Sequence, residues 1–420
     1  MRILYVSSDL GIPVLGHRGG SVHVRSLVDA LARAGHSVVV ASPLLTKSQW
    51  ETPARLDVPV LRVEPSALTT SASRSLEAFA ATVGATNLLQ DELRRILYND
   101  DLADALRRRC QHAPPDAIYE RGSIYGTAGA SVARALGVPL LLEVNAPLAL
   151  EDRTYRGGSG LGELAGAAER WTVSQADAVL AVSSPLREHV VSLGVPAERV
   201  HVVPNGVDTE LFRPGLRATA VRTRWGLDGG PVLGFVGGYQ PWHGILVLPA
   251  LLERLLPRHP GLRLVVVGDG RGRHELEREI VARGLAAHTR LTGAVPHEEV
   301  PALIREFDVA VAPYLRPAHD FYFSPLKLFE YMGCAAAIAA PRLGQIEEVV
   351  RDGETGLLYS PFEPDALAEA CDRLLSDRDL GRRLGLAAAA EVRRKYTWDH
   401  NAARVTRIAE ALLAERTAAA

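Results

Sequence analysis

Two successive series of alternating strand and helix patterns constrain the fold of this chain more than any other feature. In the first series, short apolar runs such as residues 3–6 and 38–40 alternate with segments whose apolar residues keep helical spacing. A second series of similar size begins at Val232. Strands that alternate with helices form parallel sheets that are covered by helices. The sequence therefore predicts an α/β protein with two Rossmann-like domains and a cleft between them.

The predicted junction between the two series is a segment rich in turn-forming residues. Pro204-Asn-Gly-Val-Asp208 combines residues that favour turns, and the chain that follows it to Gly230 is rich in Arg and Gly. We therefore predict that the first domain ends at residue 205 and that the second begins at residue 206.

The composition is typical of a soluble globular protein and excludes several classes. The 420 residues are 47% hydrophobic and 23% charged, and the formal net charge of -2 argues against nucleic acid as the main partner. Three cysteines are too few and too scattered for a disulfide framework or a zinc site. The N-terminus lacks the apolar core of a signal peptide, and no run of about 18 apolar residues is present to span a membrane. We expect a cytoplasmic enzyme or binding protein.

The stretch from Asp320 to Gly333, with the sequence DFYFSPLKLFEYMG, gives the strongest indication of a ligand site. Ser324 is a suitable N-cap and Pro325 suits the first helical position, so we predict a helix that starts here. The unpaired N–H groups and the dipole at its tip favour an anion such as phosphate, and Lys327 adds a full positive charge. Glu330, one turn further on, is better suited to accept hydrogen bonds from sugar hydroxyls. An ordinary capped helix with a surface Lys–Glu pair would have the same pattern.

A glycine-rich loop in the first domain is a second candidate for phosphate binding. Residues 9–20 follow the first strand and end in Gly19-Gly20, and Ser21 is predicted to open the next helix. This arrangement lets backbone approach a phosphate, although the G-x-G-x-x-G spacing of dinucleotide sites is absent. A tight connection that binds no ligand remains an alternative.

The strand predicted at residues 139–144 is followed by candidate acceptor-binding residues. Ligands of open α/β sheets bind beyond the carboxyl ends of the strands, where Glu143 and Asn145 lie. Glu151 opens a polar, glycine-dense segment, residues 151–162, that we interpret as a mobile loop and a candidate acceptor lid. Alternatively, Glu143 and Asn145 only finish a strand and cap a turn.

Two amphipathic helical patterns, around residues 76–97 and 102–110, carry a group of arginines. A solvated helix face explains these side chains most simply, and contact with a membrane surface or an acidic acceptor is the alternative. The arginines are Arg94, Arg95, Arg107, Arg108 and Arg109.

Taken in order along the chain, several segments resemble those of the retaining GT-B glycosyltransferases of family 4. The segments are Gly19-Gly20, VPNGVD at 203–208, VGDG at 267–270, SPLKLFEYM at 324–332 and DGETGLL at 352–358. The resemblance implies two Rossmann-like domains that face each other across a cleft and a C-terminal helix that returns to the first domain. It assigns residues 1–205 and 397–420 to an acceptor-binding domain and residues 206–396 to a nucleotide-sugar-binding domain.

The resemblance also assigns roles to individual residues. Glu330 matches the glutamate that binds the donor ribose, and Lys327 and His243 are expected to stabilise the charge that grows on the leaving diphosphate. The predicted donor-binding residues are Gly19, Gly20, Gly238, Arg271, Tyr322, Ser324, Pro325, Leu326, Leu328 and Glu330. Glu143, Asn145 and Glu151 are the predicted acceptor-binding residues.

The chain departs from the family pattern at four positions. Tyr322 stands where the first of two paired glutamates is expected, and Gly238 and His243 stand where an Arg and a Lys are usual. Asn145 occupies a position that is often a histidine. Lys327 and Arg271, with His243 if it is protonated, would supply the missing positive charge.

The resemblance implies a retaining glycosyltransferase of the hexosyl or N-acetylhexosaminyl type. It would move a sugar from a UDP- or GDP-sugar to a hydroxyl of a small soluble acceptor or glycan, by front-face displacement in which the leaving phosphate helps to deprotonate the acceptor. No metal and no separate cofactor are expected, and peripheral contact with a membrane stays open. The alternatives are a nucleotide-sugar epimerase or hydrolase on the same fold, and a nucleotide-sugar-binding protein that has lost catalysis.

Overall fold

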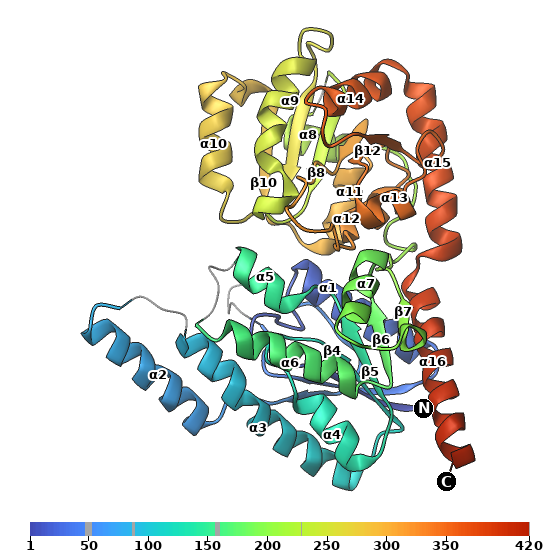
Figure 1. The fold of residues 1–420 in the computed structure, drawn as a ribbon. Helices are drawn as coiled ribbons and strands as arrows, with labels where there is room; N and C mark the ends of the chain where they lie inside the picture. Colours follow the sequence, from blue (N-terminus) through green and yellow to red (C-terminus); the bar gives the residue numbers. More distant parts are fainter. Residues whose placement is uncertain (47–52, 86–88, 156–159, 228, 420) are drawn as a thin grey trace. The chain divides into compact units, whose positions relative to one another are not determined.

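The structure is a computed structural model that describes residues 1–46, 53–85, 89–155, 160–227 and 229–419. The chain forms two compact units. Unit 1 comprises residues 1–204 and 399–420, and unit 2 comprises residues 205–398. These limits lie one and two residues away from the domain boundaries expected from the sequence. Each unit is a parallel sheet with helices packed on its two faces (Figure 1).

Unit 1 contains a seven-stranded sheet in the order β3-β2-β1-β4-β5-β6-β7. Its neighbouring strands are parallel, and the central strands β1, β4, β5 and β6 are mostly buried and apolar, as a sheet covered on both faces requires. The strands are β1 (Arg2–Ser7), β2 (Ser37–Ser42), β3 (Val60–Arg62), β4 (Ala117–Arg121), β5 (Leu140–Val144), β6 (Ala178–Ala181) and β7 (Val200–Val202). The helices are α1 (Gly19–Arg33), α2 (Ala67–Thr82), α3 (Leu89–His112), α4 (Ala128–Leu136), α5 (Leu148–Tyr155), α6 (Gly162–Gln175) and α7 (Ser184–Ser192).

Unit 2 repeats this topology with a six-stranded parallel sheet in the order β10-β9-β8-β11-β12-β13. The strands are β8 (Val232–Val236), β9 (Arg263–Val267), β10 (Thr289–Gly293), β11 (Val309–Val311), β12 (Ile338–Pro341) and β13 (Leu357–Tyr359). The helices are α8 (Thr219–Trp225), α9 (Leu248–Leu255), α10 (Arg273–Ala282), α11 (Val300–Ile304), α12 (Leu326–Gly333), α13 (Gly344–Val349), α14 (Ala366–Ser376) and α15 (Arg378–Lys395). Both units are therefore Rossmann-like, as the sequence predicted.

The order of strands reverses at one point in each sheet. In unit 1 the reversal lies between β1 and β4, and in unit 2 it lies between β8 and β11. At such a switch point the loops that follow the two strands diverge to opposite faces, and they leave a crevice outside the carboxyl ends of the strands. The loops after β1, β4, β8 and β11 are therefore the places where each unit is expected to bind ligands.

The C-terminal helix α16 (Trp398–Ala419) packs on unit 1 from residue 399 onwards, so the predicted return of the chain to the first domain is confirmed. The side-chain amide of Asn401 donates a 2.8 Å hydrogen bond to the carbonyl of Pro204. Near the end of the helix, Arg416 forms a 2.8 Å ion pair with Asp177. These contacts hold the last segment of the chain against the strands of unit 1.

The helix boundaries between residues 67 and 112 differ from those expected. The weak periodicity of residues 45–75 predicts loops with short strands, and the two helical patterns, at 76–97 and 102–110, leave residues 98–101 between them. In the structure α2 begins at Ala67, and α3 continues through residues 98–101. The break lies instead after Thr82, where Gly84 adopts a left-handed φ of 67°. The polar run Asn99-Asp100-Asp101 stays helical because Asp101 accepts hydrogen bonds from Ser66 and Thr69 at the start of α2.

The sequence pattern predicts a helix over residues 124–136, but α4 begins at Ala128 because Tyr125 has a left-handed φ of 61°. The apolar run at residues 335–339 predicts a strand, but strand β12 covers Ile338–Pro341 and so begins three residues later. Ala335, with a φ of 57°, belongs to the turn before it.

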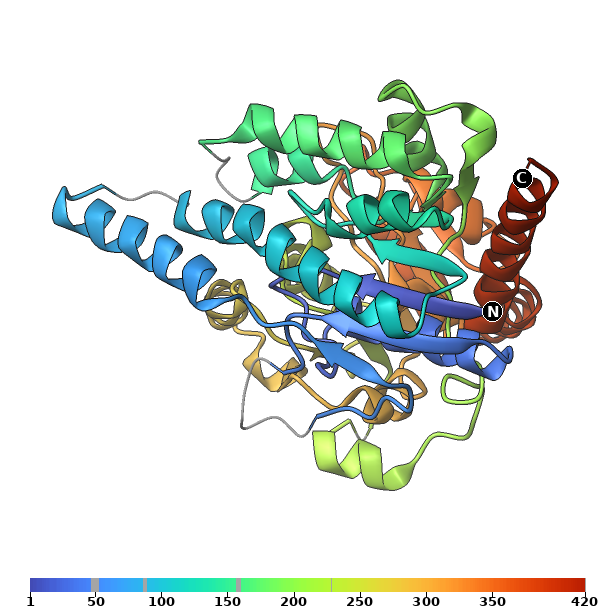
Figure 2. The same cartoon turned by 90° about the horizontal axis from the view of Figure 1, so that it is seen from below.

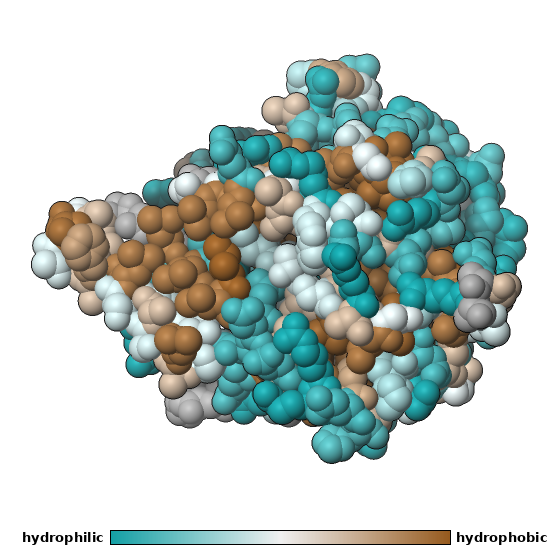
Figure 3. Space-filling model, turned by 60° about the horizontal axis from the view of Figure 1, so that its bottom comes forward, coloured by the Kyte–Doolittle hydropathy of each residue, from teal (hydrophilic) through white to brown (hydrophobic). Residues whose placement is uncertain are grey.

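Helix α2 presents an unusual surface. It packs along α3 through the small residues Thr69, Ser73 and Ala80, while Leu68 and Phe79 are 73% and 64% exposed. Figure 2 shows α2 and α3 side by side and projecting from unit 1, and Figure 3 shows a hydrophobic area over this part of the unit. Among the described helices, none is both long enough and apolar enough to cross a membrane.

Replacement of Asp101 by alanine should loosen α2. The Ser66 amide and the Thr69 hydroxyl would lose their shared acceptor, which should lower the local unfolding free energy of α2 by about 1–2 kcal/mol. Hydrogen exchange of the α2 amides measures this change. The matched control is Asp100→Ala, which removes an exposed carboxylate one position away. Equal exchange in the two variants would contradict the role of Asp101.

Candidate functional site

A buried lysine lies at the switch point of unit 2. Lys327, in the first turn of α12, is only 6% exposed, and its ammonium group has no hydrogen-bond partner among the described residues. The Nζ atom lies 4.3 Å from the centre of the Phe235 ring and 4.8 Å from that of Tyr314. Burial lowers the pKa of Lys327 to about 7, against an opposing effect of Glu330. A cation with so few compensating contacts is prepared to bind an anion.

Gly237 makes room for this ammonium group directly after β8. Gly237 has a φ of 145°, which only glycine adopts readily, and a Cβ atom at this position would lie 2.9 Å from the Lys327 Nζ. The lysine therefore depends on a glycine that is 90 residues away in the sequence.

The structure corrects the predicted cap of α12. Pro325, in an extended conformation, is the N-cap residue, and neither Pro325 nor Ser324 caps the helix through a side chain. The Ser324 hydroxyl instead accepts a 3.0 Å hydrogen bond from the backbone N–H of Asn205, and the side-chain amide of Asn205 donates a hydrogen bond to the Ser324 carbonyl. Ser324 thus anchors the start of α12 to the first residue of unit 2.

The amides at the tip of α12 are only partly available to a ligand. The Leu328 N–H donates a 3.1 Å hydrogen bond to the Pro325 carbonyl. This N–H is therefore not free to donate a hydrogen bond to a phosphate, as was predicted. The amides of Leu326 and Lys327 belong to the first turn, where a helix supplies no acceptor of its own.

Glu330 is held by a histidine that the sequence analysis missed. The Nε2 atom of His297 lies 3.0 Å from Glu330 Oε1, and the His297 ring packs 5.1 Å from the ring of Phe212. Glu330 Oε2 has no hydrogen-bond partner among the described residues. His297 therefore orients the carboxylate and leaves one oxygen to accept a hydrogen bond. No local sequence signal links the two residues, because they are 33 positions apart.

His243 was expected to add positive charge only if it is protonated, and its surroundings favour the neutral ring. Burial, followed by the nearby Lys327, lowers the pKa of His243 to about 3, so the ring is neutral at pH 7. Its Nδ1 atom lies 2.5 Å from the carbonyl oxygen of Gly238, and it must carry the proton because a carbonyl only accepts. His243 therefore adds no positive charge, and its Nε2 lone pair is available as an acceptor.

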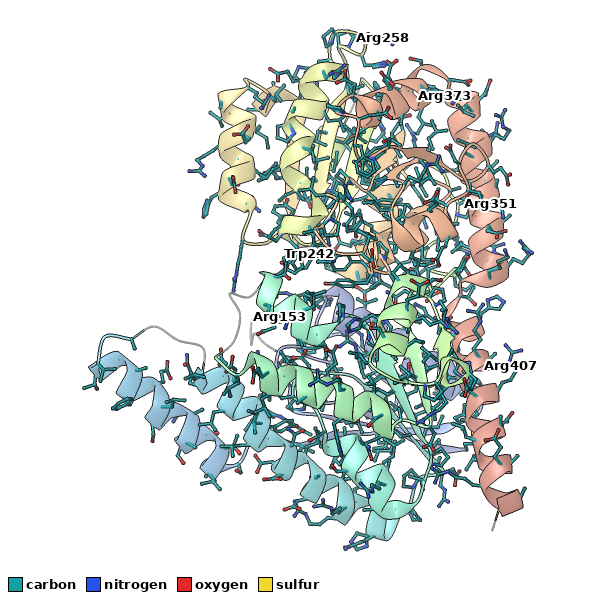
Figure 4. The ribbon with its side chains drawn as sticks, in the orientation of Figure 1. Arg153, Trp242, Arg258, Arg351, Arg373 and Arg407 are labelled. Atoms are coloured by element: carbon teal, nitrogen blue, oxygen red, sulfur yellow. The ribbon has the colours of Figure 1, made fainter. Side chains whose placement is uncertain are left out.

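The remaining donor-site candidates in unit 2 differ in exposure. Tyr322 is 3% exposed and stacks on His319 with the ring centres 5.1 Å apart. Phe323 stacks on Trp242, which is labelled in Figure 4. Gly238 and Arg271 are exposed. Arg271 follows β9 on the loop that precedes α10.

Glu143 of unit 1 lies inside a buried hydrogen-bond network. It is 3% exposed and accepts hydrogen bonds from His23 at 2.9 Å, from Asn145 at 2.5 Å and from the Tyr119 hydroxyl. Burial raises the pKa of Glu143, but His23, Arg121 and Tyr119 outweigh it and bring the pKa to about 2. The carboxylate therefore stays ionised and holds its neighbours in place, while its contact with an acceptor stays a prediction.

The other predicted residues of unit 1 lie on two helices. Gly19 and Gly20 form the first turn of α1 rather than a loop before it. Glu151 is half-buried in α5, so the start of the predicted acceptor lid is helical. Residues 156–159 of the lid lie outside the described residues. No group of three or more potential metal-ligating side chains occurs in the described parts of the chain, and independence from metals stays a prediction.

Two family models match the chain. The model for glycosyltransferase family 4 matches residues 17–211, and the model for glycosyl transferases group 1 matches residues 230–377. The D-inositol 3-phosphate glycosyltransferase of Acidothermus cellulolyticus is 34% identical over 336 residues, which cover 76% of this chain and 72% of the relative. This chain therefore belongs to glycosyltransferase family 4 and is a glycosyltransferase.

Solved structures show the same fold. Sucrose-phosphate synthase of Thermosynechococcus elongatus aligns with a TM-score of 0.73 and 20% identity over 99% of each chain. The HepE protein of Anabaena, in complex with UDP-glucose, aligns with a TM-score of 0.70 and 19% identity over 98% of this chain and 99% of that chain. With its two Rossmann-like units and its returning C-terminal helix, the chain has the GT-B fold.

Replacement of Lys327 by methionine should stabilise the ligand-free protein, because it removes a buried charge that lacks partners. We expect the free energy of unfolding to rise by about 1 kcal/mol or more at pH 6.5. Native Lys327 loses its proton near pH 7, whereas the unfolded lysine keeps it up to its ordinary pKa of 10.5. The difference in unfolding free energy between the variant and the original protein should therefore shrink as the pH rises from 7 towards 10.5. Urea unfolding at several pH values measures it.

Lys395→Met is the control for this experiment, because Lys395 is 41% exposed and forms a 2.7 Å ion pair with Glu391. Its loss should leave stability unchanged or lower it. A Lys327→Met variant that is less stable than the original protein at pH 6.5 would contradict the description of the site.

Proposed function

We propose that this glycosyltransferase moves a hexosyl or N-acetylhexosaminyl group from a UDP- or GDP-sugar to a hydroxyl of a small soluble acceptor, with retention of anomeric configuration. The buried ammonium of Lys327 at the switch point of unit 2 is the observation that carries this proposal. A diphosphate would supply the negative charge that Lys327 lacks, and its binding would be favoured most strongly where water is excluded.

Glu330 supports a nucleoside diphosphate over a free phosphate. Its carboxylate lies one helical turn beyond Lys327, and His297 keeps one of its oxygens occupied. The other oxygen suits a ribose hydroxyl, which donates a hydrogen bond that phosphate oxygens do not offer.

The reaction that we propose needs no covalent intermediate with the protein. The acceptor oxygen bonds to the anomeric carbon on the face from which the phosphate oxygen departs, and the acceptor proton passes to that phosphate oxygen. Negative charge grows on the diphosphate as the glycosidic bond breaks. Lys327 and the first-turn amides of α12 would stabilise this charge more in the transition state than in the bound donor.

The names of relatives support the choice of substrates. The HepE structure was solved with UDP-glucose, and the name of the Acidothermus cellulolyticus relative indicates transfer to an inositol phosphate. By similarity, we propose a nucleotide-sugar donor and a polar, ring-shaped acceptor for this chain.

A donor panel tests this proposal directly. UDP- and GDP-sugars are incubated with the protein with and without small sugar and cyclitol acceptors, and nucleotide release is measured together with the anomeric configuration of the product. Release that depends on an acceptor, with a retained configuration, is the expected result. Equal release with and without acceptors would favour a hydrolase, and binding without release would favour a protein that has lost catalysis.

Lys327→Ala and Glu330→Gln should affect different kinetic parameters. Loss of the cation that stabilises the leaving group should lower kcat by about 100-fold or more. Loss of the charged ribose acceptor should raise the donor KM by roughly 10-fold with a smaller effect on kcat. Arg278→Ala, an exposed change on α10, is the control. Unchanged kinetics in both site variants would refute the assignment of the site.

A further inference from the structure

The carboxylate of Glu330 is held on one side by residues from three separate parts of unit 2. His297 follows β10, Phe212 lies between β7 and α8, and Gly333 is the last residue of α12. We call these three residues the Glu330 wall. They are far apart in the sequence, so the tertiary structure alone brings them together around the carboxylate.

Gly333 allows Phe212 to pack directly on α12. It lies one turn beyond Glu330 on the same side of the helix. A Cβ atom at Gly333 would lie 2.7 Å from the Phe212 carbonyl oxygen and 3.0 Å from the Phe212 Cβ. Arg305 holds the same segment, since its Nε donates a 3.0 Å hydrogen bond to the carbonyl of Arg213. The buried ring of Phe212 is therefore fixed from two directions.

His297 is in turn fixed between Phe212 and Glu330. Its ring centre lies 5.1 Å from that of Phe212, and its Nε2 lies 3.0 Å from Glu330 Oε1. Because a carboxylate only accepts, Nε2 is the donor of this bond. The side chains of His297 and Glu330 are 18% and 10% exposed, and neither makes another side-chain hydrogen bond among the described residues. Oε1 therefore has its donor before a ligand binds, and Oε2 is the oxygen left for the ligand.

This arrangement changes how the carboxylate can bind a ribose. A ribose ring carries two adjacent hydroxyls, at the 2′ and 3′ positions, and each donates one hydrogen bond. A carboxylate with both oxygens open can accept one bond from each hydroxyl. With Oε1 bonded to His297, Glu330 offers one open oxygen to two donors, and a hydrogen bond weakens steeply when its donor is misaligned. Only one of the two hydroxyls then reaches good geometry.

We infer that His297 is a positioning residue that restricts Glu330 to a single ribose hydroxyl, so that the donor site requires one of the 2′- and 3′-hydroxyls and tolerates the loss of the other. This inference rests on the proposed nucleotide-sugar donor. It widens the class of accepted donors to nucleoside diphosphate sugars that lack the unused hydroxyl.

Calorimetric titration of the full chain with UDP and GDP, and with their 2′-deoxy and 3′-deoxy forms, measures this selectivity without turnover. For the nucleotide that binds, one deoxy form should bind within about twofold of the parent, and the other about tenfold or more weakly, because it loses a hydrogen bond to a charged acceptor. This comparison uses the unaltered protein, so it does not depend on the folding of a variant.

Three variants test whether His297 sets the selectivity. His297→Phe keeps a ring against Phe212 but opens both carboxylate oxygens, so the affinity ratio of the two deoxy forms should fall to about threefold or less. His297→Gln, whose side-chain amide still donates, should keep most of the ratio. His274→Phe is the matched control, because the side chain of this histidine on α10 is 95% exposed. A purely structural role of His297 would lower stability and leave the ratio unchanged.

Two results would overturn the inference alone. They are equal affinities of the original protein for the two deoxy forms, and a ratio that His297→Phe leaves unchanged. Binding of neither UDP nor GDP would overturn the proposed donor and the inference together. If the ratio behaves as expected but no acceptor receives a sugar, the proposed transfer fails and the role of His297 stands.

Discussion

An ammonium group buried beside two aromatic rings is the constraint on which the candidate donor site depends. Lys327 carries a charge that burial opposes, and the rings of Phe235 and Tyr314 compensate for it only in part. A Cβ atom at Gly237 would lie 2.9 Å from the ammonium group and would force the lysine to shift. Such an arrangement lowers the stability of the empty protein and favours any anion that reaches it. A stable fold tolerates this cost where binding requires it.

The same topological rule holds in both units, and in unit 2 it positions the candidate donor site. In each unit the strand order reverses once, and the loops that follow the two central strands carry the polar groups. In unit 2 these loops hold Gly237 and Tyr314 around the lysine, and in unit 1 they carry Asp9 after β1 and Ser123 after β4. The parallel sheets contribute little chemistry of their own. They fix the distance between loops that are far apart in the sequence.

Sequence reasoning succeeded where the signal was local and failed where a distant partner decided the outcome. The alternation of strands and helices predicted nearly all the elements of both sheets. The helical patterns at 76–97 and 102–110 left residues 98–101 between them, but Asn99 and Asp101 have hydrogen-bond partners in other segments and stay helical. Ser324 was predicted to cap a helix, yet its hydroxyl accepts a hydrogen bond from the backbone N–H of Asn205 instead. In each case the side chain satisfied a distant group rather than its own backbone.

By itself, the sequence determined the two Rossmann-like series and the placing of Lys327 and Glu330 one turn apart, because hydrophobic periodicity and helical spacing are local properties. The return of the C-terminal helix to the first domain was implied by the family resemblance and not by periodicity. The tertiary structure alone decided that His243 is neutral and that His297 holds Glu330. Burial and contacts across many residues set these properties, and neither can be read from neighbouring positions in the chain.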